Sequence, residues 1–79
     1  MLIYYINRGI VKSDLGDRYG AIADYTKSIE LNPNDSRAYW NRCLEKFRLG
    51  DNNGACRDAR YALKLGNNDA TRFINNECN

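Results

Sequence analysis

The chain repeats itself with a period of 34 residues. When residues 2–35 are laid over residues 36–69 without a gap, 13 of the 34 pairs are identical. About three identical pairs are expected by chance from this composition. The identical pairs are Tyr5/Tyr39, Asn7/Asn41, Arg8/Arg42, Lys12/Lys46, Leu15/Leu49, Gly16/Gly50, Asp17/Asp51, Gly20/Gly54, Ala21/Ala55, Asp24/Asp58, Leu31/Leu65, Asn34/Asn68 and Asp35/Asp69. A period of this length is typical of helical hairpins that stack on one another to bury a shared core.

Each unit contains two helical stretches separated by a Leu-Gly-Asp sequence. In the first stretch, Ile3, Ile6 and Ile10 have the spacing of one helix face. Gly16 can adopt the left-handed conformation that ends a helix, and Asp17 is placed to cap the next one. No strand-like alternation competes with this pattern, so we expect an all-α fold. The expected helices cover residues 2–15, 19–31, 36–49, 55–65 and 70–76.

The composition argues against several classes of function. The 79 residues include no histidine, which removes the commonest general base and metal ligand. The 12 Lys and Arg are balanced by 10 Asp and Glu, and a net charge of +2 is low for a protein that grips nucleic acid. The carboxylates of Asp14, Asp17, Glu45 and Asp51 are interpreted as solvated side chains and helix caps. We therefore expect no enzyme, cofactor, metal or nucleic-acid partner.

The cysteines and the apolar runs indicate where the chain resides. Cys43, Cys56 and Cys78 are an odd number with no CxxC spacing, which favours buried or inert thiols in a reducing cytosol. The longest apolar run, residues 1–6, is far shorter than the roughly 20 residues of a membrane span. It also lacks the features of a signal peptide. We expect a cytoplasmic protein without a membrane partner.

Particular residue types recur at fixed places in the two units. The first unit has Tyr5, Gly9, Leu15-Gly16, Ala21, Tyr25 and Pro33, and the second has Tyr39, Cys43, Leu49-Gly50, Ala55 and Ala62. With the ungapped period, these residues resemble the tetratricopeptide repeat (TPR). The resemblance covers residues 2–69, and residues 70–79 look like the start of a third unit or a capping helix.

The sequence departs from the family pattern in two ways. Cys43 replaces the usual glycine, Ala59 replaces the aromatic residue of the second helix, and Asn67 replaces the proline of the turn. Four cations replace leucine and tyrosine, and we expect their stems to cover apolar surface while their charges reach water. These cations are Arg8, Lys12, Arg42 and Lys46.

The resemblance implies a right-handed stack of helical hairpins in one domain of residues 1–79. It also implies a non-catalytic scaffold that binds a peptide or a partner helix on its concave face. The residues at the matching places are Ile3, Ile6, Ile10, Ser13, Arg37, Trp40, Asn41, Leu44, Phe47 and Arg48.

One sub-function of the family is not expected. Some TPR proteins hold the C-terminal tails of chaperones in a clamp of lysine, arginine and asparagine. Asn41 is the one matching residue here, because Ile6, Ile10, Thr71 and Asn75 stand at the other places. No cation is therefore available to receive a terminal carboxylate.

The stripe of Trp40, Leu44 and Phe47 is open to three interpretations. It can be part of the core, it can be open to a foreign partner, or it can be filled by Phe73 and Ile74 of the chain's own tail or by another copy. Two units and a short helix are few for a stable stack. The alternative function is therefore a self-assembling module, in which a homo-oligomer fills the groove, with or without exchange of a helix.

Overall fold

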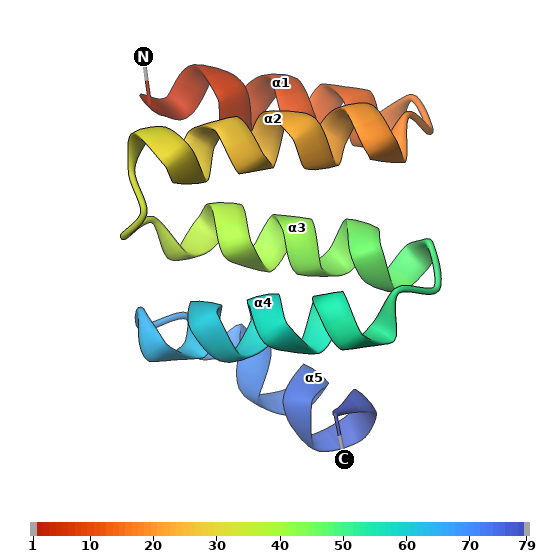
Figure 1. The fold of residues 1–79 in the computed structure, drawn as a ribbon, viewed down its shortest axis with the longest axis vertical. Coiled ribbons are helices and arrows are strands. Elements are labelled where there is room, and N and C mark those ends of the chain that lie inside the picture. Colours follow the sequence, from red (N-terminus) through yellow and green to blue (C-terminus); the bar gives the residue numbers. More distant parts are fainter. Residues whose placement is uncertain (1, 79) are drawn as a thin grey trace.

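A computed structural model describes residues 2–78 of the chain. Each helix packs on the next one along the chain, so the helices form a row of adjacent hairpins (Figure 1). The predicted all-α fold is therefore confirmed for this part of the chain. The five helices are α1 (Leu2–Asp14), α2 (Arg18–Leu31), α3 (Ser36–Arg48), α4 (Asn52–Lys64) and α5 (Asp69–Glu77).

Left-handed glycines end three of the helices. Gly16, Gly50 and Gly66 have φ angles of 85°, 87° and 104°, which a residue without a Cβ adopts at little cost. After the first two glycines, the next amide donates to the carbonyl oxygen of Lys12 at 2.8 Å and of Lys46 at 2.9 Å. These bonds satisfy carbonyl groups that a helix end otherwise leaves unpaired.

Aspartate side chains start the second helix of each hairpin. The carboxylate of Asp17 accepts a hydrogen bond from the Gly20 amide, and that of Asp51 accepts one from the Gly54 amide, both at 2.9 Å. The predicted role of Asp17 as a cap is thus confirmed. Because the cap fixes the first turn, α4 begins at Asn52 and not at residue 55 as predicted.

Small side chains build the core between α3, α4 and α5. Such residues let helix backbones approach closely, and larger side chains then seal the edges of the contact. The buried cluster contains Tyr39, Cys43, Ala55, Ala59, Ala62 and Ala70. Ile29, Trp40, Leu65, Phe73 and Ile74 pack around it and remain partly exposed.

The two hairpins divide the volume between their helices in opposite ways. A Cβ on Gly9 would lie 2.6 Å from Cε1 of the buried Tyr25 ring, so the ring occupies the space that a side chain would need. At the corresponding places of the second hairpin, Cys43 and Ala59 are both fully buried. The second hairpin therefore has a larger residue on its first helix, α3, and a smaller one on its second helix, α4, than the first hairpin has at the corresponding places.

This packing predicts that Gly9→Ala destabilises the fold by about 1–3 kcal/mol through overpacking. On helix propensity alone the same substitution would stabilise α1 by roughly 0.8–1 kcal/mol. Urea unfolding followed by circular dichroism shows whether Gly9→Ala lowers or raises the free energy of unfolding. The double variant Gly9→Cys/Tyr25→Ala transplants the second hairpin's pair, and a double-mutant cycle should show favourable coupling. A more stable Gly9→Ala variant would contradict the packing argument.

Candidate functional site

A buried carboxylate joins the first helices of the two hairpins, α1 and α3. Glu45 is 2% exposed. Its Oε2 accepts from the Ser13 hydroxyl at 2.6 Å and from Arg48 Nη1 at 3.3 Å, and its Oε1 accepts from Arg18 Nη1 at 3.0 Å. The prediction that Glu45 is a solvated side chain is wrong, because these donors replace the water that a buried carboxylate loses.

A second buried carboxylate lies between α1 and α2. Asp24 receives a two-point contact from Arg8, with Nε at 2.9 Å and Nη2 at 2.8 Å, and Lys12 Nζ lies 3.3 Å away. The hydrogen bonds from Arg8 hold the pKa of Asp24 below its usual value, although burial opposes this shift. These cations were expected to direct their charges to water, and they instead pair with a buried acid.

The same arrangement recurs in the second hairpin. Arg42 contacts Asp58 through Nε and Nη2, both at 2.8 Å, and Lys46 Nζ lies 3.1 Å from the same carboxylate. Arg42 also donates from Nη1 to the Thr26 hydroxyl of α2 at 3.1 Å. Hydrogen bonding to Asp58 raises the pKa of the guanidinium group. The charged groups of the second hairpin are thus also bonded to the first.

The predicted stripe on α3 is covered by α5. The ring of Phe73 lies edge-on to Trp40 and Phe47, with centroid distances of 5.9 Å and 5.2 Å. Trp40 and Leu44 are partly buried, and Phe47 is 36% exposed. Of the interpretations left open by the sequence, the structure shows the one in which the chain's own tail fills the stripe.

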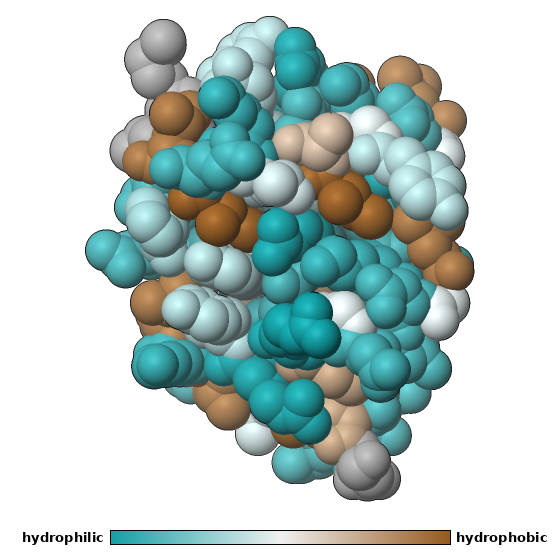
Figure 2. All heavy atoms as spheres, viewed as in Figure 1, coloured by the Kyte–Doolittle hydropathy of each residue, from teal (hydrophilic) through white to brown (hydrophobic). Residues whose placement is uncertain are grey.

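The three predicted residues of α1 have different environments. Ile6 is 3% exposed, so it belongs to the core and is not available to a partner. Ile3 and Ile10 are exposed, at 51% and 40%. On the face drawn in Figure 2, hydrophobic side chains form separate patches among polar ones, most of them in the upper half of the picture.

The polar residues predicted for the surface are partly engaged within the chain. Arg37 binds Asp35, the residue that caps α3, through Nε at 3.0 Å and Nη2 at 2.7 Å. These hydrogen bonds lower the pKa of Asp35. Asn41 is partly buried, while Arg48 is exposed beyond its contact with Glu45. The structure thus leaves Ile3, Ile10 and Phe47 as the exposed apolar part of the predicted site.

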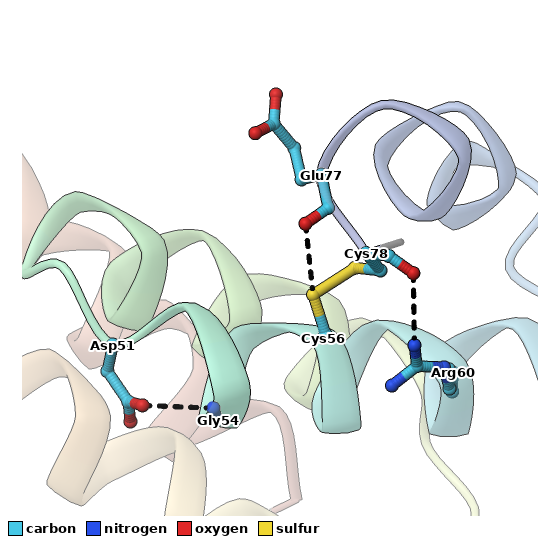
Figure 3. The surroundings of a disulfide bond; sticks show 6 residues. All are labelled: Asp51, Gly54, Cys56, Arg60, Glu77 and Cys78. Carbon is cyan, nitrogen blue, oxygen red and sulfur yellow. Dashed lines mark hydrogen bonds between the residues drawn. A yellow bond between two sulfur atoms is a disulfide. The ribbon is translucent and has the colours of Figure 1, made fainter.

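A disulfide between Cys56 and Cys78 ties the end of α5 to α4 (Figure 3). Their Cα atoms are 5.6 Å apart, and Arg60 Nη2 donates to the Cys78 carbonyl oxygen at 3.2 Å. Cys56 Sγ also lies 3.6 Å from the Glu77 carbonyl oxygen, a packing contact because an oxidised sulfur carries no proton. The prediction of unpaired thiols is wrong for these two cysteines, since the fold brings together residues that no spacing rule connects. Cys43 is free and buried, and burial raises its pKa to about 12.

The disulfide also bears on the expected cytoplasmic location. Disulfides are rare in cytosolic proteins, so the cysteines no longer support that expectation. Within residues 2–78, no helix combines the length and the apolar character needed to cross a membrane.

Among the described residues, no group of three or more His, Cys, Asp or Glu side chains is arranged to hold a metal ion. The sequence matches no protein-family model, and no curated protein is significantly similar to it. The functional argument therefore depends on the geometry of this chain.

The Asp24 ion pair predicts a specific pH dependence. Because the pKa of Asp24 is lowered in the folded state, the pair stabilises the fold fully above the unfolded pKa of about 3.9 and loses that effect as pH falls through the folded pKa. Asp24→Asn should cost about 1–3 kcal/mol at pH 7, and it should lose less further stability on acidification than the wild type. Urea midpoints between pH 7 and pH 3 test this, with the exposed Asp14→Asn as control. Equal pH slopes for wild type and Asp24→Asn would contradict the pairing.

The disulfide closes a loop with a sequence separation of 22 residues, and its loss should cost about 2–4 kcal/mol. In Cys78→Ser, or after reduction, we expect α5 to detach and Trp40 emission to shift to longer wavelength, because the ring loses Phe73. Thiol titration of the oxidised protein at pH 8 should find no reactive thiol in the folded state and one, Cys43, after unfolding. Labelling of Cys56 or Cys78 before any reductant is added would refute the disulfide.

Proposed function

We propose that this chain is a non-catalytic protein–protein interaction module of TPR-like helical hairpins, which binds a peptide or a partner helix along α1 and α3. Three features support the hairpin-repeat assignment, because each occurs twice at an interval of 34 residues. They are the left-handed glycine that ends a first helix, the aspartate that caps a second helix, and the buried aspartate held by an arginine and a lysine. The right-handed stack belongs to this proposal.

The observation that carries the proposed function is the set of exposed apolar residues on the two first helices. Ser13 and Glu45 hold α1 next to α3, and Ile3, Ile10 and Phe47 remain exposed on these helices. Single exposed apolar residues are ordinary, whereas a set on adjacent helices is typical of an interaction surface.

The chemistry of this surface suits an amphipathic helix or an apolar peptide with acidic residues beside its apolar ones. Arg37 and Arg48 lie at the two ends of α3, and their side chains are 57% and 48% exposed. Guanidinium groups bind carboxylates with good geometry. The partner would therefore place apolar side chains against Ile3, Ile10 and Phe47 and carboxylates near either arginine.

A self-assembling module is the second candidate, because eleven large hydrophobic residues are exposed on the described surface. In that case another copy would cover the exposed residues Ile3, Ile10 and Phe47. Phe73 of the same chain already packs on Trp40 and Phe47, so in both candidates the occupant contacts the exposed residues beside the filled groove.

Adjacent residues of α1 provide a matched test of the proposed surface. Peptides of twelve residues selected from a random display library should bind the wild type, and Ile10→Lys should weaken them about tenfold, because a lysine ammonium is poorly tolerated in an apolar contact. Val11→Lys is the control, since Val11 is similarly exposed but points to another side of the helix. Calorimetric titration gives both dissociation constants.

Two results would count against the proposed function. Selected peptides whose affinity is unchanged by Ile10→Lys would bind somewhere else. A solution mass that is a multiple of 9.1 kDa at all concentrations, and that Ile10→Lys reduces to 9.1 kDa, would favour the self-assembling module.

A further inference from the structure

One face of α1 and its C-terminal turn is exposed from end to end. Tyr4, Arg8, Val11 and Leu15 follow one another at intervals of four, three and four residues, so they share one side of the helix. Tyr4, Val11 and Leu15 are 51%, 55% and 79% exposed, and the Arg8 side chain is 44% exposed. This face, here called the α1 edge, is distinct from the side that carries Ile3 and Ile10.

The corresponding face of α3 is covered. The residues 34 positions later are Ala38, Arg42, Glu45 and Leu49. Ala38 and Glu45 are 0% and 2% exposed, the Arg42 side chain is 17% exposed, and Leu49 is 37% exposed. At each of the four positions, the residue on α3 is less accessible than its counterpart on α1.

The helix that covers this face of α3 is α2, through polar and apolar contacts. Arg18 donates to Glu45, and the Thr26 hydroxyl accepts from Arg42. Ile29 packs on the core cluster to which α3 contributes. Along α2, one side of the helix carries Arg18, Ile22, Thr26 and Ile29. These four positions define the pattern of a helix that can cover this face of α3.

Arg8 lacks the partner that Arg42 has. Its Nη1 donates at 3.1 Å to the hydroxyl of Tyr4 on the same helix, and its guanidinium carbon lies 5.2 Å from the Tyr4 ring centre. Arg42 uses the same nitrogen to reach Thr26 on the neighbouring helix. In the row of helices in Figure 1, α1 and α2 form one end, and no described helix lies beyond them to supply an acceptor.

Beside the α1 edge lies a mainly apolar cleft of about 400 Å³, lined by Tyr4, Tyr5, Lys27 and Leu31. In the second hairpin, the counterparts of Tyr5 and Lys27 are Tyr39 and Tyr61, whose rings stack at 4.8 Å. The first hairpin has a lysine where the second has a ring. The cleft therefore has room for an apolar or aromatic side chain from outside the chain.

We propose that the α1 edge binds a helix of another protein. This helix would contact α1 through the same kinds of side-chain contact that α2 makes with α3. Opposite Arg8 this helix presents a hydroxyl or carboxylate group, as Thr26 does opposite Arg42. Opposite Val11 it presents an aliphatic residue, because Val11 stands where α3 has Glu45 and a basic residue like Arg18 would find no carboxylate there. Aliphatic residues at the places of Ile22 and Ile29 complete the recognition pattern.

A second copy of this chain is a poor occupant. The complementary side of α2 is already used by α3. The next helix in the 34-residue register is α4, and its Arg60 stands at the place of Thr26. Stacking α4 of one copy on the α1 edge of another would bring Arg60 against Arg8, and like charges at an interface oppose association. The disulfide also holds α5 on α4.

The probe for this proposal is a fluorescein-labelled peptide of residues 18–31 with Arg18→Leu. A covalent bridge between positions 20 and 24 keeps it helical, since a helix of this length is marginal alone. The bridge lies opposite the recognition side and removes the Asp24 carboxylate that binds Arg8 and Lys12, so the peptide lacks the ion pairs that hold α2 in its own hairpin. Fluorescence anisotropy against the full chain gives the dissociation constant.

We expect saturable binding that Val11→Lys weakens at least tenfold and Ile10→Lys changes less than twofold. A peptide that also carries Thr26→Lys should not bind, because its ammonium would face Arg8. Amide chemical shifts should move at Tyr4, Arg8, Val11 and Leu31. In the peptide-library test of α1 and α3, Ile10→Lys is the disrupting variant and Val11→Lys is the control, whereas here the two are exchanged. Failure of one proposal can therefore be distinguished from failure of the other.

Three results would overturn the α1 edge proposal. One is the absence of saturable binding up to the solubility limit of the probe. Another is an equal response to Ile10→Lys and Val11→Lys, which would place the probe elsewhere. The third is a self-associated wild type that Val11→Lys converts to a 9.1 kDa monomer, which would make a second copy the occupant.

Discussion

The carboxylate of Glu45 sits where the two hairpins meet, and its hydrogen bonds come from both. Ser13 and Arg18 belong to the first hairpin, whereas Glu45 and Arg48 belong to the second. A buried carboxylate without partners costs several kcal/mol, so these donors restrict how the hairpins can be placed against each other. The counterpart of Glu45 on α1 is Val11, which needs no polar partner. On α3 this helix face is covered by α2 and contains a buried carboxylate, whereas on α1 it is exposed and has Val11 at the same place.

When the two 34-residue segments are compared, polar and apolar positions differ in how often the residue is the same. The buried aspartates and the cations that hold them are identical in both units, because a charge-assisted hydrogen bond needs particular atoms at particular distances. Apolar positions are exchanged more freely, as Gly9 with Tyr25 becomes Cys43 with Ala59. Packing requires the summed volume to be right and leaves the division between helices open. Identity between the units therefore marks the electrostatic framework more clearly than the hydrophobic core.

The sequence was sufficient to predict the helices, because Gly16, Asp17 and their counterparts act locally through backbone conformation and capping. It was insufficient for Glu45, since nothing near that residue shows that α2 covers it. The Cys56–Cys78 bridge was missed for the same reason, because the angle of α5 on α4 brings the two sulfurs together. One signal for the ion pairs is present in the sequence, because an arginine, a lysine and an aspartate recur together 34 residues apart. For the stripe on α3, the sequence left three outcomes open because α5 is short, and its contact with Trp40 depends on packing.

The two ends of the row of helices differ, and both of the proposed binding surfaces include α1. At one end, α5 presents exposed polar residues and is fixed by the disulfide. At the other end, α1 packs on α2, and among the described residues two of its sides are exposed, one with Ile3 and Ile10 and the other with the α1 edge. Successive residues of a helix point about 100° apart, so Ile10 faces the surface shared with α3, and Val11 faces the α1 edge. One helix can thus offer two surfaces of different chemistry, one next to the exposed arginines of α3 and one around Arg8. The two surfaces share a backbone but no side chain, so a substitution in one need not alter the other.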